Sequence, residues 1–507
     1  MSVADFNFGR LFQDHVNGDR LAAIDLTKFD APREVTYREL DACCDAVARG
    51  IVAAGFGAGD RIGLLALNRW EYLAVLFGAM RAGCVPVPVN NKLPADAVEY
   101  VLRDSGARLV FSEAPLRKLV PDDVTFVDLD SDFGDFCDPG QFDSLEPGED
   151  RVSMQPYTSG TTGKPKGVLL THDRQIWAAR TLVEYRRLVA EDRILISAPF
   201  FHKNALVAIK TALLPGACLV ILPKFDVAQS IQAIADHKCT MTTGVPTMMY
   251  MILQEEKLLA SADTSSIRTI SMGSAPCSES LLDGLKRFFP QAEINLNYGT
   301  TEGGPIMLGW YHPDGMPRPL HSVGYPIPGC EFKFIDGPHE KEGELICRNP
   351  GVALGYHNLP EVTAERFVDG WYHTGDVMRQ DGDGWFYFIG RTDDMFVCGG
   401  ENIYPSEVEA LLERHDDIVQ AAVLPFDDER KGQLPFAFVV PKEGVTLDVD
   451  SVKKFALANG PAYAHPREVF FMPEMPLSGT NKIDRIALRD HVAAAMHNTE
   501  SRRNARK

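Results

Sequence analysis

The chain has 507 residues, of which 45% are hydrophobic and 24% charged, and its formal net charge is −19. A chain of this length and composition is folded rather than disordered, and it is too long for one hydrophobic core, so two or more domains are expected. The acidic balance argues against nucleic-acid binding through a generally basic surface, and ten scattered cysteines without a C-x-x-C pair or a Cys/His cluster argue against a zinc site or a disulfide framework.

The first part of the chain alternates between strand-like and helix-like periodicity. Residues 1–20 contain Asp5 and no apolar core segment, so no signal peptide is expected. Buried strands are predicted over residues 61–68, 85–89 and 108–112, with apolar-striped helices over residues 71–82 and 95–104 between them. This β-α-β-α-β order is typical of a parallel sheet with helices on its faces. The acidic stretch 121–147 is interpreted as a surface excursion.

Further strands are predicted over residues 193–197, 217–222 and 267–271. The longest apolar stretch, residues 205–222, is interrupted by Lys210 and by Pro215 and Gly216, so we do not expect a transmembrane segment. From residue 343 to residue 390 the pattern changes to short strands with many Gly, Asp and Trp, which indicates a small barrel or antiparallel sheet.

After residue 394 the chain predicts a compact unit with helices over residues 407–414 and 452–458 and strands over residues 420–425, 436–440 and 469–472. We therefore predict an α/β protein. Its large N-terminal domain, residues 1–390, would combine helix-flanked sheets with a small β-barrel-like part. A hinge over residues 391–394 would join it to a small mobile α+β C-terminal domain over residues 395–507.

The segment YTSGTTGKPKG, residues 157–167, has the composition of a phosphate-binding loop. Glycines let backbone N–H groups approach phosphate oxygens, hydroxyls add donors and lysines neutralise charge. It is not a Walker A loop, because Pro165 stands where Ser or Thr would hold magnesium. The predicted nucleotide-binding residues of this loop are Thr158, Ser159, Gly160, Thr161, Thr162, Gly163, Lys164 and Lys166.

This loop resembles the signature of the adenylate-forming superfamily, which includes acyl- and aryl-CoA synthetases, adenylation domains of peptide synthetases, and luciferases. Further segments that resemble its motifs follow in the same order over nearly the whole chain. They are PFFH at 199–202, GSAP at 273–276, NYGTTE at 297–302, GELICRNPGVALGY at 343–356, WYHTGD at 371–376, GRTDDMFVCGGENIYPSEVE at 390–409 and NKIDR at 481–485. The resemblance is greatest to the CoA synthetase branch.

The resemblance assigns roles around ATP. It implies that Thr301 donates to the α-phosphate and that Glu302 helps to hold Mg²⁺, a cation that prefers oxygen ligands. Asp376 would accept hydrogen bonds from both ribose hydroxyls, and Arg391 would support the ribose and phosphates. Tyr298 would offer a flat ring beside adenine, with Ser274, Ala275 and Asn297 lining the base. Gly299 and Thr300 are further expected nucleotide-binding residues.

Lys482 is the residue that the resemblance assigns to adenylation, because its ammonium can bridge the attacking carboxylate and the α-phosphate. Many relatives have Gly before this lysine, where this chain has Asn481. Asp393 occupies the hinge position, about which the small domain would rotate after adenylation. The rotation would replace Lys482 with residues 397–402, in which Gly399 and Gly400 would line a narrow passage for the pantetheine arm of CoA. Glu401 is the third expected CoA-binding residue.

His202 is expected where the acid pocket meets the thiol passage, as a fourth catalytic residue beside Lys482, Thr301 and Glu302. By analogy the acid pocket would be lined by Lys203, Val245, Met249, Met272, Gly273 and Gly303. Because a lysine stem reaches solvent easily, we expect Lys203 to point outward and predict a monocarboxylic acid with a medium-sized apolar body. An inward Lys203 would instead favour a dicarboxylic acid.

The resemblance implies an AMP-forming acid–CoA ligase that uses ATP and Mg²⁺ and takes coenzyme A as co-substrate. It would bind a small carboxylic acid and no nucleic acid, and we expect it in the cytoplasm, with a homodimer left open. An enzyme that loads a carrier protein, a luciferase-type oxygenase and a nonenzymatic nucleotide sensor remain alternatives. Free CoA as a sufficient acceptor would separate the first alternative, and light or oxygen uptake the second. The retained Lys482, Glu302 and Asp376 argue against the third.

Overall fold

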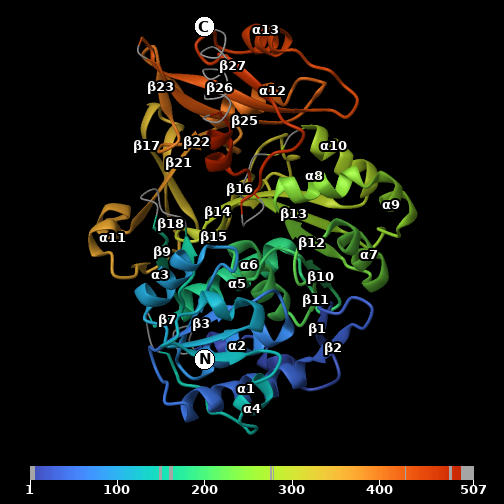
Figure 1. The fold of residues 1–507 in the computed structure, drawn as a ribbon, viewed down its shortest axis with the longest axis vertical. Helices are drawn as coiled ribbons and strands as arrows, with labels where there is room; N and C mark the ends of the chain where they lie inside the picture. Colours follow the sequence, from blue (N-terminus) through green and yellow to red (C-terminus); the bar gives the residue numbers. More distant parts are fainter. Residues whose placement is uncertain are drawn as a thin grey trace, which may run out of the picture.

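The computed structural model describes residues 6–147, 151–158, 164–273, 277, 279–428, 430–478 and 482–492. Figure 1 shows a large body made by the first three quarters of the chain and a smaller C-terminal part above it, coloured orange to red. No helix in the described ranges is long and apolar enough to cross a membrane. None of the ten cysteines forms a disulfide bond in the described residues.

A four-stranded parallel sheet confirms the predicted β-α-β-α-β order. Its strands, in spatial order, are β4 (Val85–Pro88), β3 (Arg61–Leu65), β5 (Leu109–Ser112) and β6 (Thr125–Asp128). Helices α2 (Trp70–Arg81) and α3 (Ala95–Ser105) connect the first three strands, and α3 ends at Gly106, whose φ of 74° is easily adopted by glycine. Strand β6 and the short helix α4 (Phe133–Phe136) lie in the stretch interpreted as a surface excursion, so that interpretation is wrong in part. Only Phe126 and Val127 mark β6 as apolar, which is too short a signal among acidic neighbours.

A nine-stranded sheet forms the centre of the large body. Its strands, in spatial order, are β16 (Tyr325–Pro326), β15 (Gly304–Trp310), β14 (Glu293–Thr300), β13 (Thr269–Gly273), β12 (Met241–Gly244), β10 (Arg193–Ile196), β11 (Cys218–Ile221), β1 (Leu21–Asp25) and β2 (Arg33–Thr36). Pairing is parallel from β14 to β1 and antiparallel at both edges.

Alternate side chains of the central strands enter two different cores. In β10, Ile194 and Ile196 pack with α5 (His172–Arg186) and α6 (Lys203–Leu213), whereas Leu195 packs on the other face with α7 (Val227–His237) and α8 (Pro246–Gln254). Both faces of the sheet are therefore covered, as parallel strands require. The remaining helices of the large body are α1 (Tyr37–Ala53), α9 (Glu256–Ser261), α10 (Glu279–Phe288) and α11 (Pro360–Arg366), with short 3₁₀ turns at Phe8–Arg10, Gln13–His15 and Ala114–Leu119.

Antiparallel strands follow, as the change of pattern after residue 343 predicted. One sheet contains β17 (Glu331–His339), β18 (Glu342–Arg348), β21 (Trp371–Gln380), β20 (Phe367–Val368) and β22 (Phe386–Arg391). A smaller one contains β7 (Val152–Met154), β8 (Tyr157–Thr158), β9 (Lys166–Thr171) and β19 (Gly355–Tyr356). The second sheet joins the end of the predicted phosphate loop to the strand that carries Tyr356.

The C-terminal part has its own sheet and its own hydrophobic clusters. Its strands are β23 (Phe396–Cys398), β24 (Glu401–Ile403), β25 (Ile418–Asp428), β26 (Gly432–Pro441) and β27 (Glu468–Phe471), and its helices are α12 (Pro405–Leu412) and α13 (Val449–Asn459). The predicted α+β character is confirmed. The residue before α12 is Tyr404, and Ser406 does not cap the helix but donates its hydroxyl to the Ile389 carbonyl oxygen.

Candidate active site

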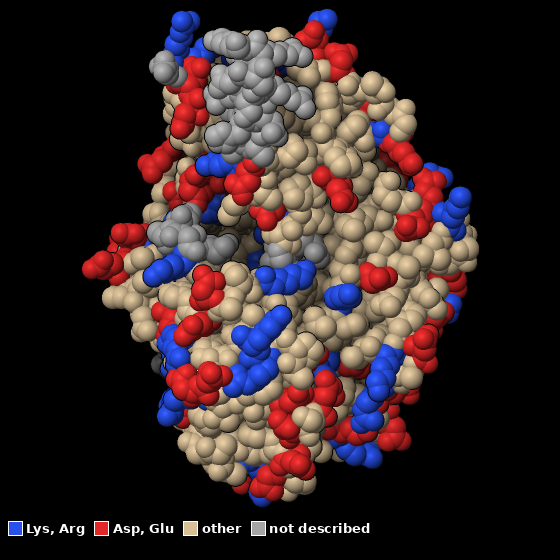
Figure 2. Space-filling view, in the orientation of Figure 1, with Lys and Arg blue, Asp and Glu red and all other residues tan. Residues whose placement is uncertain are grey.

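Two cavities share Lys203 and Val207 of α6. The first cavity is lined by Met154, Pro156, Leu170, Arg174, Gln175, Ala178, Lys203, Leu206, Val207, Lys210, Thr301 and Gly351. The second cavity is lined by Arg186, Lys203, Asn204, Val207, Thr243, Ser271, Met272, Gly273, Asn297, Gly299 and Ile306. Thr243, Gly273 and Asn297 lie toward the carboxyl ends of parallel strands, where open α/β sheets bind their ligands. Figure 2 shows this face hollowed at mid-height, with Lys and Arg side chains along the lower edge of the hollow.

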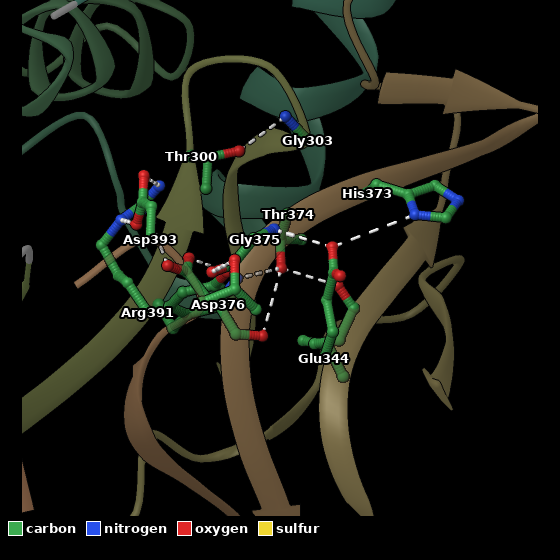
Figure 3. A network of polar contacts seen from close by, with 12 residues as sticks. Thr300, Gly303, Glu344, His373, Thr374, Gly375, Asp376, Arg391 and Asp393 are labelled. Carbon is green, nitrogen blue, oxygen red and sulfur yellow. Dashed lines mark hydrogen bonds and ion pairs between the residues drawn. The ribbon is translucent and has the colours of Figure 1, made fainter. Parts of the chain in front are cut away.

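Asp376 is the centre of a polar network that Figure 3 shows from close by. Its two carboxylate oxygens accept hydrogen bonds from the Tyr298 hydroxyl at 2.5 Å and from the Arg391 guanidinium at 2.8 Å. The same guanidinium donates to both oxygens of Asp393, at 2.8 and 3.0 Å. Three segments, 298, 376 and 391–393, thus meet at one carboxylate, which is buried.

The local fold explains this meeting. Asp376 on β21 is the direct cross-strand partner of Arg391 on β22. The preceding residue, Gly375, has a φ of 71°, and its carbonyl oxygen accepts from the Thr392 backbone N–H at 2.8 Å. Its own N–H donates to Glu344 at 3.0 Å. This left-handed turn residue therefore fixes where the Asp376 side chain leaves the sheet.

The pKa of Asp376 is raised by burial, an effect that Arg391 and the Tyr298 hydroxyl oppose. Burial and the neighbouring Asp376 carboxylate together raise the pKa of Tyr298 well above its usual value, so its hydroxyl keeps its proton and stays a donor. A carboxylate in this setting retains lone pairs for further donors, such as hydroxyl groups of a ligand.

Glu302 is also buried and lies in the turn between β14 and β15. Its Oε1 accepts from the Thr158 hydroxyl at 3.0 Å and from the Tyr356 hydroxyl at 3.2 Å. Thr158 stands at the start of the predicted phosphate loop, so the structure joins the loop to the NYGTTE segment through Glu302. Thr301 of the same turn lines the first cavity.

Of the predicted nucleotide-binding residues in the phosphate loop, the structure describes Thr158, Lys164 and Lys166. The Lys164 ammonium lies over the Tyr100 ring and the Lys166 ammonium over the Tyr356 ring, each 5.4 Å from the ring centroid. Seven of the predicted nucleotide-binding residues lie outside the described residues: Ser159, Gly160, Thr161, Thr162, Gly163, Ser274 and Ala275.

His202 and Lys203 lie together at the beginning of α6. The His202 Nδ1 accepts from the Asn204 backbone N–H at 3.3 Å and so caps the helix. Burial, together with the charges of Lys482 and Lys203, lowers the pKa of His202 to about 3, so its ring is neutral near pH 7. Lys203 does not point outward as expected but forms part of the wall of both cavities. Its pKa is lowered to about 7, first by burial and then by Lys482.

Lys482 reaches this site from the C-terminal part. Burial and the Arg391 charge lower its pKa, whereas the Asp376 carboxylate raises it. The segment is anchored by Arg485, which donates to Glu409 of α12 at 2.6 Å and to the Val423 carbonyl oxygen at 2.8 Å. The most distant of the predicted catalytic residues in the sequence is therefore brought to the others.

The predicted CoA-binding residues are not brought to the cavities. Gly399, Gly400 and Glu401 are exposed on the β23–β24 hairpin, and the two glycines have φ values of 62° and 92°. The Gly399 N–H donates to the Lys431 carbonyl oxygen at 2.9 Å. Asp393, the predicted hinge residue, is exposed and paired with Arg391.

The NYGTTE segment divides between the cavities and the protein interior. Asn297 and Gly299 line the second cavity. The Asn297 amide, however, donates to the Ser271 hydroxyl at 2.8 Å and accepts from Tyr185. The Thr300 hydroxyl accepts from the Gly303 N–H at 2.7 Å and closes the turn.

The predicted acid pocket corresponds in part to the second cavity. Lys203, Met272 and Gly273 line it, whereas Val245 and Met249 are buried and line neither cavity. Gly303 packs against Tyr372, where a Cβ atom would come within 2.9 Å of the ring. The sequence missed the polar members of the wall, which are Arg186, Asn204, Thr243 and Ser271. Of these, only Asn204 lies close to a sequence motif, two residues after the PFFH segment at 199–202, and could have been found from it.

Comparison with known proteins agrees with this geometry. The AMP-binding enzyme family matches residues 12–357, and the AMP-binding enzyme C-terminal domain matches residues 407–482. The chain belongs to the AMP-binding enzyme family. The resemblance inferred from the motifs is thereby confirmed, and with it the expected nucleotide-binding chemistry of the large domain.

Relatives place this AMP-binding enzyme in the CoA ligase branch. A feruloyl-CoA synthase of Amycolatopsis sp is 34% identical over 89% of this chain and 92% of its own. An indoleacetate–CoA ligase of Aromatoleum aromaticum is also 34% identical, over 91% of this chain and 94% of its own. The solved structure of the anthranilate CoA ligase AuaEII in complex with anthranoyl-AMP superposes with a TM-score of 0.88 at 26% identity, covering 98% of this chain and all of that one. The predicted fold class is confirmed.

Proposed function

We propose that this acid–CoA ligase adenylates its carboxylic acid where the second cavity meets Lys203 and Lys482. The observation that carries this proposal is the pairing of the buried Asp376 with Arg391 at 2.8 Å, with the C-terminal Lys482 within electrostatic reach of both groups. A C-terminal ammonium is thereby added to a site otherwise built by the large domain. An ammonium there can hold two anions, a carboxylate and a phosphate, close together.

At the nucleotide end, Asp376 would accept the ribose hydroxyls while Tyr298 and Arg391 hold its carboxylate in place. The phosphate loop over residues 158–166 would surround the phosphates with N–H and hydroxyl donors, with Lys164 and Lys166 adding charge. Thr301 would donate to the α-phosphate, since it stands beside Lys203 in the wall of the first cavity. Ser274, Ala275, Asn297 and Gly299 would border the adenine, the last two through their backbone.

Glu302 fits the role of a Mg²⁺ ligand. Mg²⁺ in nucleotide sites is held by one or two carboxylates together with substrate phosphates and water. In the part of the chain that the structure describes, no three acidic, His or Cys side chains gather as a complete metal site, which agrees with a metal held mainly by ATP. The hydroxyls of Thr158 and Tyr356 would keep the Glu302 carboxylate oriented. When bound, the metal would supply charge neutralisation at the phosphates.

In the first half-reaction, an oxygen of the acid's carboxylate attacks the α-phosphorus of ATP and pyrophosphate leaves, which gives an acyl-adenylate. Lys482 would hold the carboxylate against the α-phosphate and stabilise the charge that develops at phosphorus. Lys203 and Thr301 border the same space from the large domain. No covalent bond to the protein is needed, so catalysis is positioning and electrostatics.

In the second half-reaction, the CoA thiol loses its proton and attacks the acyl carbonyl, and AMP leaves with the electron pair of the broken bond. For this step the C-terminal domain, residues 395–507, would rotate on the large domain, residues 1–390, about the hinge at 391–394. Gly399, Gly400 and Glu401 would then replace Lys482 beside His202. A glycine there leaves room for pantetheine, and the His202 ring, which is neutral near pH 7, would border the passage without adding a charge.

The test is an assay of a panel of carboxylic acids that follows ATP–pyrophosphate exchange, AMP release and thioester formation with free CoA. We expect exchange to require ATP, Mg²⁺ and an acid, and AMP and thioester to form in equal amounts. Exchange with thioester formation only on a phosphopantetheinyl carrier protein would replace the ligase with the carrier-loading alternative. No exchange with any acid would contradict the proposed function.

A further inference from the structure

We propose that Arg186 forms an anion-binding end of the second cavity, so that the acid carries a second anionic group, as a dicarboxylic acid does. This inference rests on the proposed adenylation at the other end of the same cavity, at Lys203, whose pKa the Lys482 charge helps to lower. It commits to a diacid over the monocarboxylic acid expected from the sequence, because the structure places two cations in this cavity's wall, Lys203 and Arg186.

Arg186 lies at the last position of α5 and is only 5% exposed. Its two terminal nitrogens donate to neutral hydroxyls, to Thr211 Oγ1 at 3.2 Å and to Ser271 Oγ at 3.3 Å. Its Nε is buried and has no hydrogen-bond partner. No carboxylate in the described ranges forms an ion pair with this guanidinium.

An uncompensated buried guanidinium is costly, and arginine remains charged in proteins even when buried. Burial lowers the pKa of Arg186 to about 10, so the group still carries its charge near pH 7. An anion in the second cavity would supply both the missing acceptor for Nε and the missing charge. Arginine suits this role because its planar fork matches the two oxygens of a carboxylate.

The neutral polar side chains of the second cavity already have partners. Asn204 donates to the Gly244 carbonyl oxygen at 3.2 Å and accepts from the Thr243 hydroxyl at 2.7 Å. The amide of Asn297 is held by Ser271. Among the described wall residues, Arg186 is the one with a buried donor left unmet, so it is the group that a ligand would complete.

Helix α6 gives the separation of the two ends. Lys203 stands at its first residue, and Thr211, which accepts from Arg186, stands eight residues later, about 12 Å along the helix at the usual rise per residue. Val207, Met272 and Ile306 supply the apolar part of the wall of the same cavity. The cavity therefore suits an acid with an apolar middle and an anionic group at each end.

Lys210 provides a matched control within the same helix. It is also only 5% exposed, and its ammonium contacts Gln175 rather than a carboxylate. It lines the first cavity and not the second. A substitution there removes a buried cation from α6 without changing the wall at Arg186.

The experiment compares kcat/KM in ATP–pyrophosphate exchange for a homologous series of dicarboxylic acids and monocarboxylic acids of equal length. It uses wild type, Arg186→Met, Arg186→Gln and Lys210→Met. We expect wild type to prefer diacids of one intermediate length. Loss of a charge-assisted hydrogen bond should lower the diacid-to-monoacid ratio by about tenfold to a hundredfold in both Arg186 variants, mainly through KM. Lys210→Met should keep the wild-type ratio.

Two readouts keep the test decisive if an Arg186 variant does not fold. The wild-type preference needs no variant, and a preference for monoacids would overturn the inference. In wild type, the preferred diacid should also raise Tm in the presence of ATP more than the matched monoacid does. An unchanged ratio in a folded Arg186→Gln, or the loss of preference in Lys203→Met or Lys210→Met instead, would place the second anion elsewhere and overturn the role of Arg186. Activity with monoacids alone would contradict this inference but not the proposed ligase function. No activity with any acid would contradict the proposed function itself.

Discussion

The two ends of the site differ in how their charges are compensated. At the nucleotide end, Asp376 meets Arg391 at 2.8 Å, and further donors and acceptors surround both groups. At the acid end, Arg186 donates to two hydroxyls and Lys203 forms part of the cavity wall, and neither cation forms an ion pair within the part of the chain that the structure describes. The charges at the nucleotide end are paired before any substrate binds, whereas the cations at the acid end have no paired counter-charge among the described residues.

This difference indicates that the paired groups recognise a substrate common to the family, whereas the uncompensated cations recognise a substrate that differs among family members. ATP is common to the family, so its site can be built from mutually paired residues that hold one another in place. The acid differs among family members, and an uncompensated cation there is tolerable only if the substrate supplies the counter-charge. Lys482 links the two ends electrostatically. The Asp376 carboxylate raises the pKa of Lys482, and the Lys482 charge lowers the pKa of Lys203.

The largest predicted loss of activity should follow from removing the Lys482 ammonium. In Lys482→Ala, ATP–pyrophosphate exchange should fall by about a hundredfold to a thousandfold, the usual loss when one preorganised donor at a developing charge is removed. Conversion of a supplied acyl-adenylate to the thioester should persist, since that step uses the other domain orientation. Lys442→Ala, an exposed lysine of the same domain, serves as control and should leave both rates unchanged. Equal loss of both half-reactions in Lys482→Ala would contradict the division of roles.

The reverse pattern is expected for Gly400→Leu. Exchange should continue, because this residue is exposed and away from the cavities, whereas thioester formation should fall by about a hundredfold when bulk misplaces pantetheine. The backbone φ of 92° strains any side chain, so Gly444→Leu is the matched control. Gly444, with φ of 76° and no atom within 4 Å of an added Cβ, has the same strain on another turn. If Gly444→Leu impairs thioester formation equally, strain rather than the passage is responsible.

A smaller effect is expected at Glu302, which tests whether the nucleotide end also holds the metal. Glu302→Gln keeps an acceptor for Thr158 and Tyr356 but removes the charge. The Mg²⁺ concentration that gives half-maximal exchange should rise by about tenfold to a hundredfold. The measurement is a Mg²⁺ titration of exchange at fixed free ATP. An unchanged titration curve would show that Glu302 orients the phosphate loop without touching the metal.

The elements were largely predictable from the sequence, because helices such as α2 and α3 have long apolar stripes and clear ends. The bounds of these two helices agree with the prediction to within one residue at each end, whereas those of α12 and α13 differ by up to three residues. Strand β6 was missed because four residues with two apolar side chains do not stand out from an acidic loop. The nucleotide end was predicted through its motifs, and the structure shows those segments meeting at Asp376 and Glu302.

The acid end was not predictable in the same way. Arg186 and Arg187 are adjacent in the sequence and chemically identical, yet the first is buried against Ser271 while the second is exposed with a φ of 49°. Nothing in a helical charge pattern says which of two arginines turns inward when the helix ends between them. Lys203 posed the same difficulty, because its direction depends on how α6 packs and not on its neighbours in the sequence.

The smallest predicted effect concerns the free energy of unfolding. It tests how much the buried Lys210 charge, to which no substrate anion is assigned, destabilises the fold. Burial lowers the pKa of Lys210 from 10.5 to about 7, with the Arg186 charge adding to the effect. Below pH 7 the lysine is charged in both folded and unfolded chains, and its full burial cost destabilises the fold. As the pH rises from 7 toward 10, the folded lysine loses its proton before the unfolded one does, so the cost declines. Lys210→Met should therefore raise the free energy of unfolding by about 1–4 kcal/mol at pH 6 and by less at pH 9. Denaturant unfolding at the two pH values measures this, with the exposed Lys442→Met as control, and a gain that is equal at both would show that the Lys210 charge is already compensated.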